Sequence, residues 1–231
     1  MSANRKFQSA WNNFLKGFYK RKSNKNGAGL LMYVKRMHKQ IDLAKDYGKI
    51  QLAILGDSNA ENLASYQYMK KFDPIGVSIN LAISGTRADQ WLDFFLKTKD
   101  GERIYKEISK AKILWNIGGN NILQNKMEIL KPSLLGLKKL FPFSYNCLVP
   151  PIWSRFMQFN QTQIELNHKV NLCNKYIKEI WQTRAIDTYT PFLNPNTNEP
   201  FILVHKDLVH FSKYGNSVRI PIILFHLLQS Q

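Results

Sequence analysis

The alternation of short apolar runs with longer helix-like segments is the feature that most limits how this chain can fold. From residue 50 onward, strand-length apolar runs are separated by segments in which apolar residues recur every three to four positions. Strands that alternate with helices in this way form a parallel sheet covered on both faces. We therefore predict a three-layer α/β/α sandwich with a five-stranded parallel, flavodoxin-like sheet. The expected strands are IQLAIL (50–55), GVSINLAI (76–83), AKILWNI (111–117), YNCLVP (145–150) and TRAIDTY (183–189).

Helical spacing also occurs before the first strand, so we divide the chain into a basic N-terminal helical extension, 1–49, and one domain, 50–231. In the extension, 7–19 and 30–48 have helical spacing, and KRKSNKNGAG (20–29) is typical of a loop. The first helix either packs on its own domain, which we favour, or lies on a membrane or partner. In the domain, helices are expected at 60–72, 87–109, 125–140, 161–182 and 212–229.

The stretch GDSN, residues 56–59, follows the first expected strand and precedes a helix-like pattern. Ser58 and Glu61 match a capping box, in which serine and glutamate satisfy the free amides of a helix start. On this stretch alone the structural interpretation is favoured. The alternative is that Ser58 is a nucleophile, because a side chain at a helix N-terminus beyond a strand end is exposed. The helix dipole also favours negative charge there.

Polar residues follow three other strands, and ligands of such folds bind at the carboxyl ends of the strands. The second strand runs into Gly85, the third ends at Asn120, and the fifth leads through a loop to Asp207 and His210. Each group alone fits an ordinary turn or solvated loop. Together they predict a nucleophile, oxyanion donors and an acid-base pair at one edge of the sheet. The combination favours a catalytic site.

These four blocks resemble those of the SGNH hydrolases, also called GDSL esterases and lipases. Ser58 matches the first block, in GDSN, and Gly85 matches the second, in NLAISGTRADQW. Asn120 matches the third, in IGGNN, and Asp207 and His210 match the last, in DLVHFSKYGN. The resemblance runs from about residue 50 to the C-terminus and leaves the first 49 residues outside.

The resemblance implies an ester hydrolase in which Ser58 attacks the carbonyl, His210 moves the proton and Asp207 orients the histidine. It also implies an oxyanion hole formed by the backbone amides of Ser58 and Gly85 and by the Asn120 side chain. No cofactor or metal is expected.

Two positions depart from the family pattern. Asn59 stands where leucine usually follows the serine, and Asn121 replaces the usual aspartate of the third block. We predict that both asparagines border the substrate. The α/β-hydrolases are the main rival fold, but their elbow reads Gly-x-Ser-x-Gly, and Ala60 occupies the position of the second glycine here.

The expected substrate is a small-molecule, lipid or glycan ester with a small or medium acyl group. The segment 137–159, rich in Phe, Trp and Pro, either borders the acyl pocket or packs beneath a loop. Three alternatives stay open: an acyltransferase, a thioesterase or lysophospholipase with the same triad, and a non-catalytic binding protein that retains the fold.

The formal net charge of +17 favours anionic partners, such as an anionic surface bound through the basic N-terminus, or reflects composition drift. No motif supports specific nucleic-acid binding. Cys147 and Cys173 are expected to be buried free thiols outside any metal site. No apolar run reaches the length of a membrane span, so we expect a cytoplasmic protein. The oligomeric state is left open.

Overall fold

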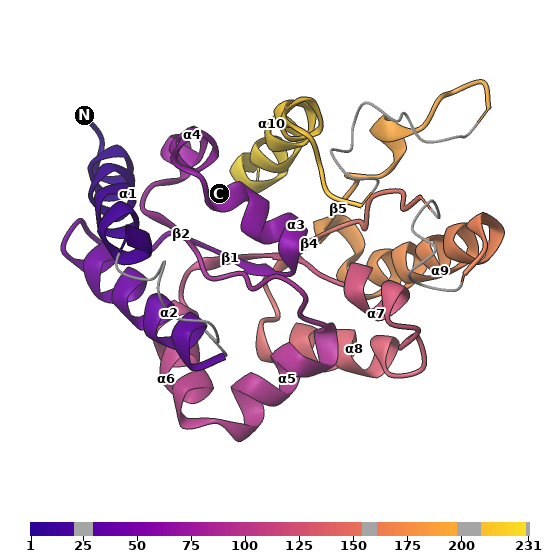
Figure 1. Ribbon diagram of the computed structural model, residues 1–231, viewed down its shortest axis with the longest axis horizontal. Coiled ribbons are helices and arrows are strands. Elements are labelled where there is room, and N and C mark those ends of the chain that lie inside the picture. Colours follow the sequence, from indigo (N-terminus) through magenta and orange to yellow (C-terminus); the bar gives the residue numbers. More distant parts are fainter. Residues whose placement is uncertain (21–29, 154–160, 198–208, 230–231) are drawn as a thin grey trace.

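A parallel sheet lies at the centre of the computed structural model, which describes residues 1–20, 30–153, 161–197 and 209–229. Within these ranges the sheet has five strands in the order β2-β1-β3-β4-β5 (Figure 1). The predicted flavodoxin-like order is confirmed. Each strand is shorter than the apolar run that predicted it. The strands are β1 (Leu52–Gly56), β2 (Ser78–Asn80), β3 (Lys112–Asn116), β4 (Tyr145–Cys147) and β5 (Ala185–Ile186).

Helices cover both faces of the sheet and complete the predicted three layers (Figure 1). Alternate residues of β1 belong to different core clusters, as expected when successive side chains point to opposite faces. Ala53 and Leu55 pack with α5 (Ala88–Lys97), α6 (Lys99–Ile108), α8 (Leu130–Leu140) and α9 (Gln163–Trp181). Leu52 and Ile54 pack with α3 (Ser58–Glu61), α4 (Tyr66–Met69) and α10 (Lys213–Gln229).

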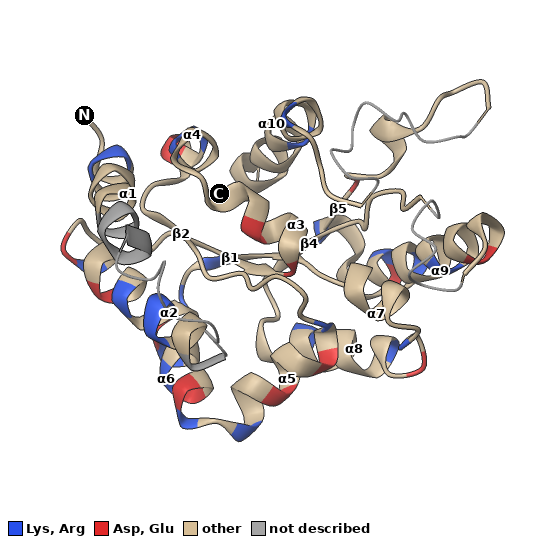
Figure 2. Cartoon of the chain, viewed as in Figure 1, with Lys and Arg blue, Asp and Glu red and all other residues tan. Residues whose placement is uncertain are grey.

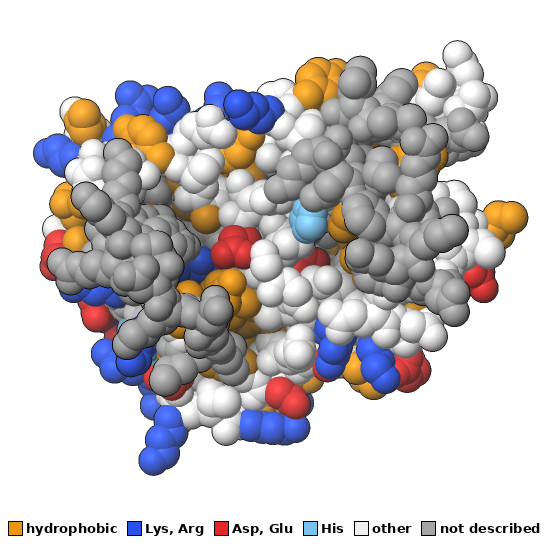
Figure 3. All heavy atoms as spheres, in the orientation of Figure 1, with side chains coloured by type: hydrophobic (Ala, Val, Ile, Leu, Met, Phe, Trp, Pro, Cys, Tyr) orange, Lys and Arg blue, Asp and Glu red, His pale blue; other side chains and the backbone are white. Residues whose placement is uncertain are grey.

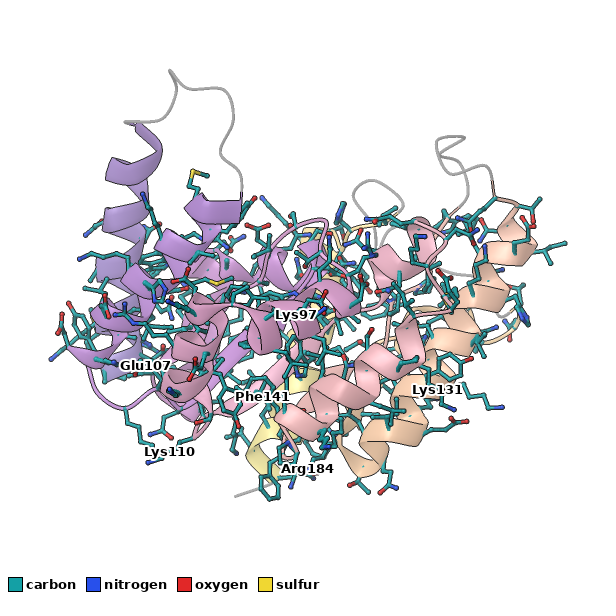
Figure 4. All side chains as sticks on the ribbon, turned by 90° about the horizontal axis from the view of Figure 1, so that it is seen from below. Lys97, Glu107, Lys110, Lys131, Phe141 and Arg184 are labelled. Carbon is teal, nitrogen blue, oxygen red and sulfur yellow. The ribbon has the colours of Figure 1, made fainter. Side chains whose placement is uncertain are left out.

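An aromatic cluster lies between the sheet and the helices α5, α6 and α8. The ring of Phe141, at the end of α8, lies 5.2 Å from Phe95 of α5 and 5.2 Å from Tyr105 of α6 (Figure 4). It also lies 5.9 Å from Trp115 of β3. These contacts connect three helices to a central strand, and such aromatic pairs add to the stability gained from burial alone.

Two predicted helices are interrupted. The segment 87–109 forms α5 and α6, because Thr98 is extended and its side chain accepts a hydrogen bond from Gly101 at the start of α6. The segment 60–72 is a series of short turns that includes the 3₁₀ helices η1 (Asn62–Ala64) and η2 (Lys70–Ile75). Ser65, with extended backbone, separates η1 from α4.

The N-terminal helices α1 (Ala3–Lys20) and α2 (Leu30–Lys45) pack beside β2 (Figure 1). Phe7 of α1 is fully buried in the larger core cluster, which agrees with a helix that packs on its own domain. The Asn4 side chain accepts from the Ser78 backbone N–H at 3.0 Å, and Gln8 donates to the Ser78 carbonyl at 2.5 Å. From α2, the side-chain amide of Gln40 donates to the Asn80 carbonyl at 2.7 Å.

Two further expectations concern the whole chain. The loop predicted at 20–29 lies, from residue 21 onward, outside the described residues. Cys147 and Cys173 are both buried free thiols, as predicted. In the part of the chain that the structure describes, no helix combines the length and apolar character needed to cross a membrane.

Candidate active site

Ser58 lies where β1 turns sharply into α3. Gly56 ends the strand with a φ of +134°, and a Cβ there would lie 2.0 Å from the Asn116 carbonyl oxygen. Only glycine suits this position, because it combines a positive φ with close approach to a neighbouring strand. The turn projects residue 58 beyond the end of the central strands.

The capping box predicted for Ser58 and Glu61 is wrong. Asp57 is the N-cap of α3, and its carboxylate accepts from the Asn59 backbone N–H at 2.9 Å. Ser58 is the first helical residue, so its own N–H has no acceptor within the helix. Asp57 therefore takes the capping role that the pattern assigned to Ser58, and the serine hydroxyl faces another partner.

That partner is His210, whose Nε2 lies 2.7 Å from Ser58 Oγ. Both residues are partly buried, and they are separated by 152 positions in the chain. This distance is that of a hydrogen bond between a nucleophile and its general base. The structure thus brings together two of the predicted site residues. Asp207, the third, lies outside the described residues.

The predicted oxyanion donors lie next to each other, with Gly85 in the loop beyond β2 and Asn120 in the short helix that follows β3. Asn120 Nδ2 donates to the Thr86 carbonyl at 3.1 Å, which fixes the orientation of its amide next to the Gly85 turn. Gly85 is exposed and has a φ of +79°. Asn120 itself lies in the short helix α7 (Gly119–Leu123), which begins after Gly118.

Asp57 is a buried carboxyl group between α3 and the start of α7. Burial raises its pKa to about 7, against backbone N–H groups of Asn59, Ala60 and Gly119 and the Arg219 guanidinium, all of which favour the charged form. The backbone N–H groups come from α3 and from the start of α7, so a single carboxyl group joins the segments that carry Ser58 and Asn120. The predicted site therefore rests on a polar group that sequence reasoning left without a role.

Glu61 holds the loop that carries Ser84 and Gly85 in place. Its carboxylate accepts from the Ser84 backbone N–H at 2.9 Å and forms an ion pair with Arg36 of α2 at 2.9 Å. Arg36 also donates to the Ala82 carbonyl at 2.6 Å. Because Ser84 precedes Gly85, this network fixes the predicted oxyanion loop. Arg36 was missed because it lies in the segment without family resemblance.

The two asparagines predicted to border the substrate have mainly structural contacts. Asn121 is fully buried, its Oδ1 accepts from the Ala88 N–H at 3.0 Å, and its Nδ2 donates to Asp89 at 3.3 Å. Its side chain therefore holds the start of α5 and has no surface open to a substrate. Asn59 lines the pocket but is only 6% exposed, and its amide bonds to the loop that carries His210.

A small pocket opens to solvent at Ser58, with about 230 Å³ of space that includes part of the open solvent. Apolar side chains form much of its wall, and Figure 3 shows that basic side chains lie mainly around the margin of this face. Among the described residues, no three His, Cys, Asp or Glu side chains gather as metal ligands. The lining residues are Asp57, Ser58, Asn59, Gly119, Asn120, Leu123, Val149, Pro150, Ile152 and Val209.

This arrangement of sheet and strand-end loops is the fold of the SGNH hydrolases. A GDSL-like lipase from Bacteroides thetaiotaomicron superposes with a TM-score of 0.69 at 16% identity, over 86% of this chain and 98% of that one. A protein from Slackia heliotrinireducens, provisionally described as an SGNH hydrolase, gives 0.57 at 12% identity, over 78% and 100% of the chains. An acetylxylan esterase from Geobacillus stearothermophilus gives 0.56 at 13%, over 77% and 94%.

The likeness lies in the fold and not in overall sequence. No family model and no curated protein sequence matches the chain. The structural neighbours confirm the fold that the four sequence blocks predicted.

Proposed function

We propose that the chain is an SGNH-type serine esterase that hydrolyses carboxylic esters of small or medium acyl groups. The observation that carries this proposal is the 2.7 Å contact between Ser58 Oγ and His210 Nε2 at the carboxyl edge of a parallel sheet. Ligands of open α/β sheets bind at this edge. Structural neighbours named as a lipase and an acetylxylan esterase support the same reaction class.

In the proposed reaction, His210 takes the proton from Ser58 Oγ as the oxygen attacks the ester carbonyl. The C–O bond to the alcohol then breaks, and His210 donates the proton to the leaving alkoxide. Water, activated by the same histidine, next attacks the acyl-enzyme and releases the acid and Ser58. Asp207 is proposed to orient the imidazole and to stabilise its charged form.

The oxyanion is proposed to bind to the N–H groups of Ser58 and Gly85 and to Asn120 Nδ2. The position of Ser58 supports this role, because the first N–H groups of a helix lack internal acceptors and the helix dipole favours an anion there. The bond from Asn120 to Thr86 uses one amide hydrogen and leaves the second for the substrate.

The pocket supports a substrate with a short acyl group. Leu123, Val149 and Ile152 form an apolar wall close to Ser58, and the pocket is small. Each methylene that such a wall buries contributes about 0.8 kcal/mol, so activity should rise over the first few carbons and then level off. A series of p-nitrophenyl esters from acetate to decanoate measures the acyl chain length at which activity levels off.

Product analysis with added alcohols separates hydrolysis from acyl transfer.

Replacement of the nucleophile tests the proposal. We expect Ser58→Ala to lower kcat on p-nitrophenyl acetate by several orders of magnitude with an unchanged circular dichroism spectrum, because no acyl-enzyme can form. Ser217→Ala, at an exposed serine of α10, is the matched control and should retain full activity. Full activity in Ser58→Ala would exclude the mechanism.

A further inference from the structure

The side chain of Asn59 bonds to the backbone on both sides of His210. Its Nδ2 donates to the Val209 carbonyl at 3.3 Å, and its Oδ1 accepts from the Phe211 N–H at 3.2 Å. Asn59 follows Ser58 directly in α3. One amide group therefore joins the helix that carries the serine to the loop that carries the histidine.

Asn59 is itself held by Arg219, a fully buried residue of α10. Arg219 Nη2 donates to the Asn59 carbonyl at 2.6 Å, and its Nε donates to Asn216 Oδ1 at 2.7 Å. Its guanidinium carbon lies 4.2 Å from the centre of the Phe211 ring. Arg219 thus contacts both partners, the backbone of residue 59 and the side chain that follows His210.

We propose that Asn59, braced by Arg219, is a positioning residue that sets His210 Nε2 against Ser58 Oγ. The proposal rests on the proposed function of this site. An amide suits the role because it supplies one donor and one acceptor, which match the carbonyl and the N–H that flank His210. A leucine, usual at this position in the family, supplies neither.

The role differs measurably from substrate binding, the role that the sequence suggested for Asn59. A residue that binds substrate equally in the ground and transition states alters KM, whereas a residue that aligns the general base alters kcat. A misplacement of about 1 Å in a catalytic group costs roughly 10²-fold in rate.

The test is Asn59→Leu with Asn4→Leu as its matched control. Asn4 is also a buried asparagine, and it likewise accepts from one backbone N–H, of Ser78, and donates to one carbonyl, of Met69. It lies on α1 and joins that helix to β2 and α4. Asn4→Leu loses the same two kinds of backbone bond and one more, because Asn4 Oδ1 also accepts from Gln8 Nε2 at 3.2 Å, so both variants should unfold at lower urea concentration. Folded sites are counted by labelling Ser58 to completion with a fluorophosphonate, and kcat is expressed per labelled site.

We expect Asn59→Leu to lower kcat per site roughly 10²-fold with KM within twofold of the wild type. Asn4→Leu should keep kcat per site within twofold. A raised KM with unchanged kcat would overturn the positioning role in favour of substrate contact, and an unchanged pair of constants would overturn it outright. Arg219→Lys, which keeps the charge but not the paired N–H groups, should lower kcat less than Asn59→Leu does.

Failure of the proposed function would look different. In that case the wild type itself would hydrolyse no ester and would take up no fluorophosphonate at Ser58. The positioning proposal is contradicted only when the wild type is active and labelled while Asn59→Leu turns over at the wild-type rate per site.

Discussion

Asp57 makes the stability of the site depend on pH. Its pKa in the folded chain is about 7 because burial disfavours the carboxylate, whereas the ordinary value is 3.8. Between these values the folded chain holds a proton that the unfolded chain releases. The stabilisation from the protonated group is therefore complete below about pH 4 and is lost as the pH rises through about 7.

We expect the free energy of unfolding of the wild type to fall more steeply between pH 5 and pH 7 than that of Asp57→Asn. The difference in slope should reach at most about 1.4 kcal/mol per pH unit. Urea denaturation at several pH values measures both slopes, and the constant cost of the substitution cancels in the comparison. Parallel slopes would show that Asp57 is ionised throughout this range in the folded chain.

Some residues of the site could be predicted from the sequence, and others could not. Ser58 and His210 could be placed because each follows a recognisable strand or motif, and the ends of parallel strands meet at one edge. The capping role of Asp57 was missed because Ser58 and Glu61 satisfy the same spacing rule. The contacts of Asn59 were missed because their partners lie 150 or more positions away, and no local pattern encodes such a pairing.

Among the elements, α1 is part of the folded core although it lies outside the family resemblance. Phe7 is fully buried in the same cluster as β1 and β3, and loss of a buried aromatic ring costs about 3–5 kcal/mol. We therefore expect Phe7→Ala to lower the free energy of unfolding by about that amount in urea denaturation. Lys6→Ala, at an exposed neighbouring position, should change it by less than about 0.5 kcal/mol.

A loss below about 1 kcal/mol in Phe7→Ala would indicate that α1 unfolds separately from the sheet.

Element boundaries were harder to predict than the elements themselves. All five strands were expected, but the break between α5 and α6 at Thr98 depends on a side-chain cap within a continuous helical rhythm. The division at residue 49 remains a prediction.

At the scale of the whole molecule, the charge is distributed over the outer helices. Lys and Arg lie along α1, α2, α5, α6, α8, α9 and α10 (Figure 2), and Lys110, Lys131 and Arg184 lie at the periphery when the molecule is viewed from below (Figure 4). A net charge of +17 attracts anions over a distance that salt limits to about 10 Å at 0.1 M. No Lys or Arg is among the described residues that line the pocket, so the basic surface acts on a substrate mainly during its approach.

We expect kcat/KM for a succinyl ester, which is anionic, to fall as ionic strength rises from about 0.01 to 0.3 M. The value for the neutral butyryl ester of the same alcohol should stay constant, because steering requires a charge on the substrate. Equal salt dependence of the two esters would show that the basic surface does not guide the substrate.

The hydrogen bonds from α1 and α2 to β2 also affect the tendency of the protein to aggregate at high concentration. A free sheet edge is a template onto which the strand of another molecule can add, and this addition propagates into insoluble aggregates. Here Asn4 and Gln8 already occupy the outward N–H and carbonyl of Ser78, and Gln40 occupies the carbonyl of Asn80. The side chains of the two N-terminal helices therefore cover the backbone groups at the β2 edge. They disfavour the addition of a strand from another molecule there.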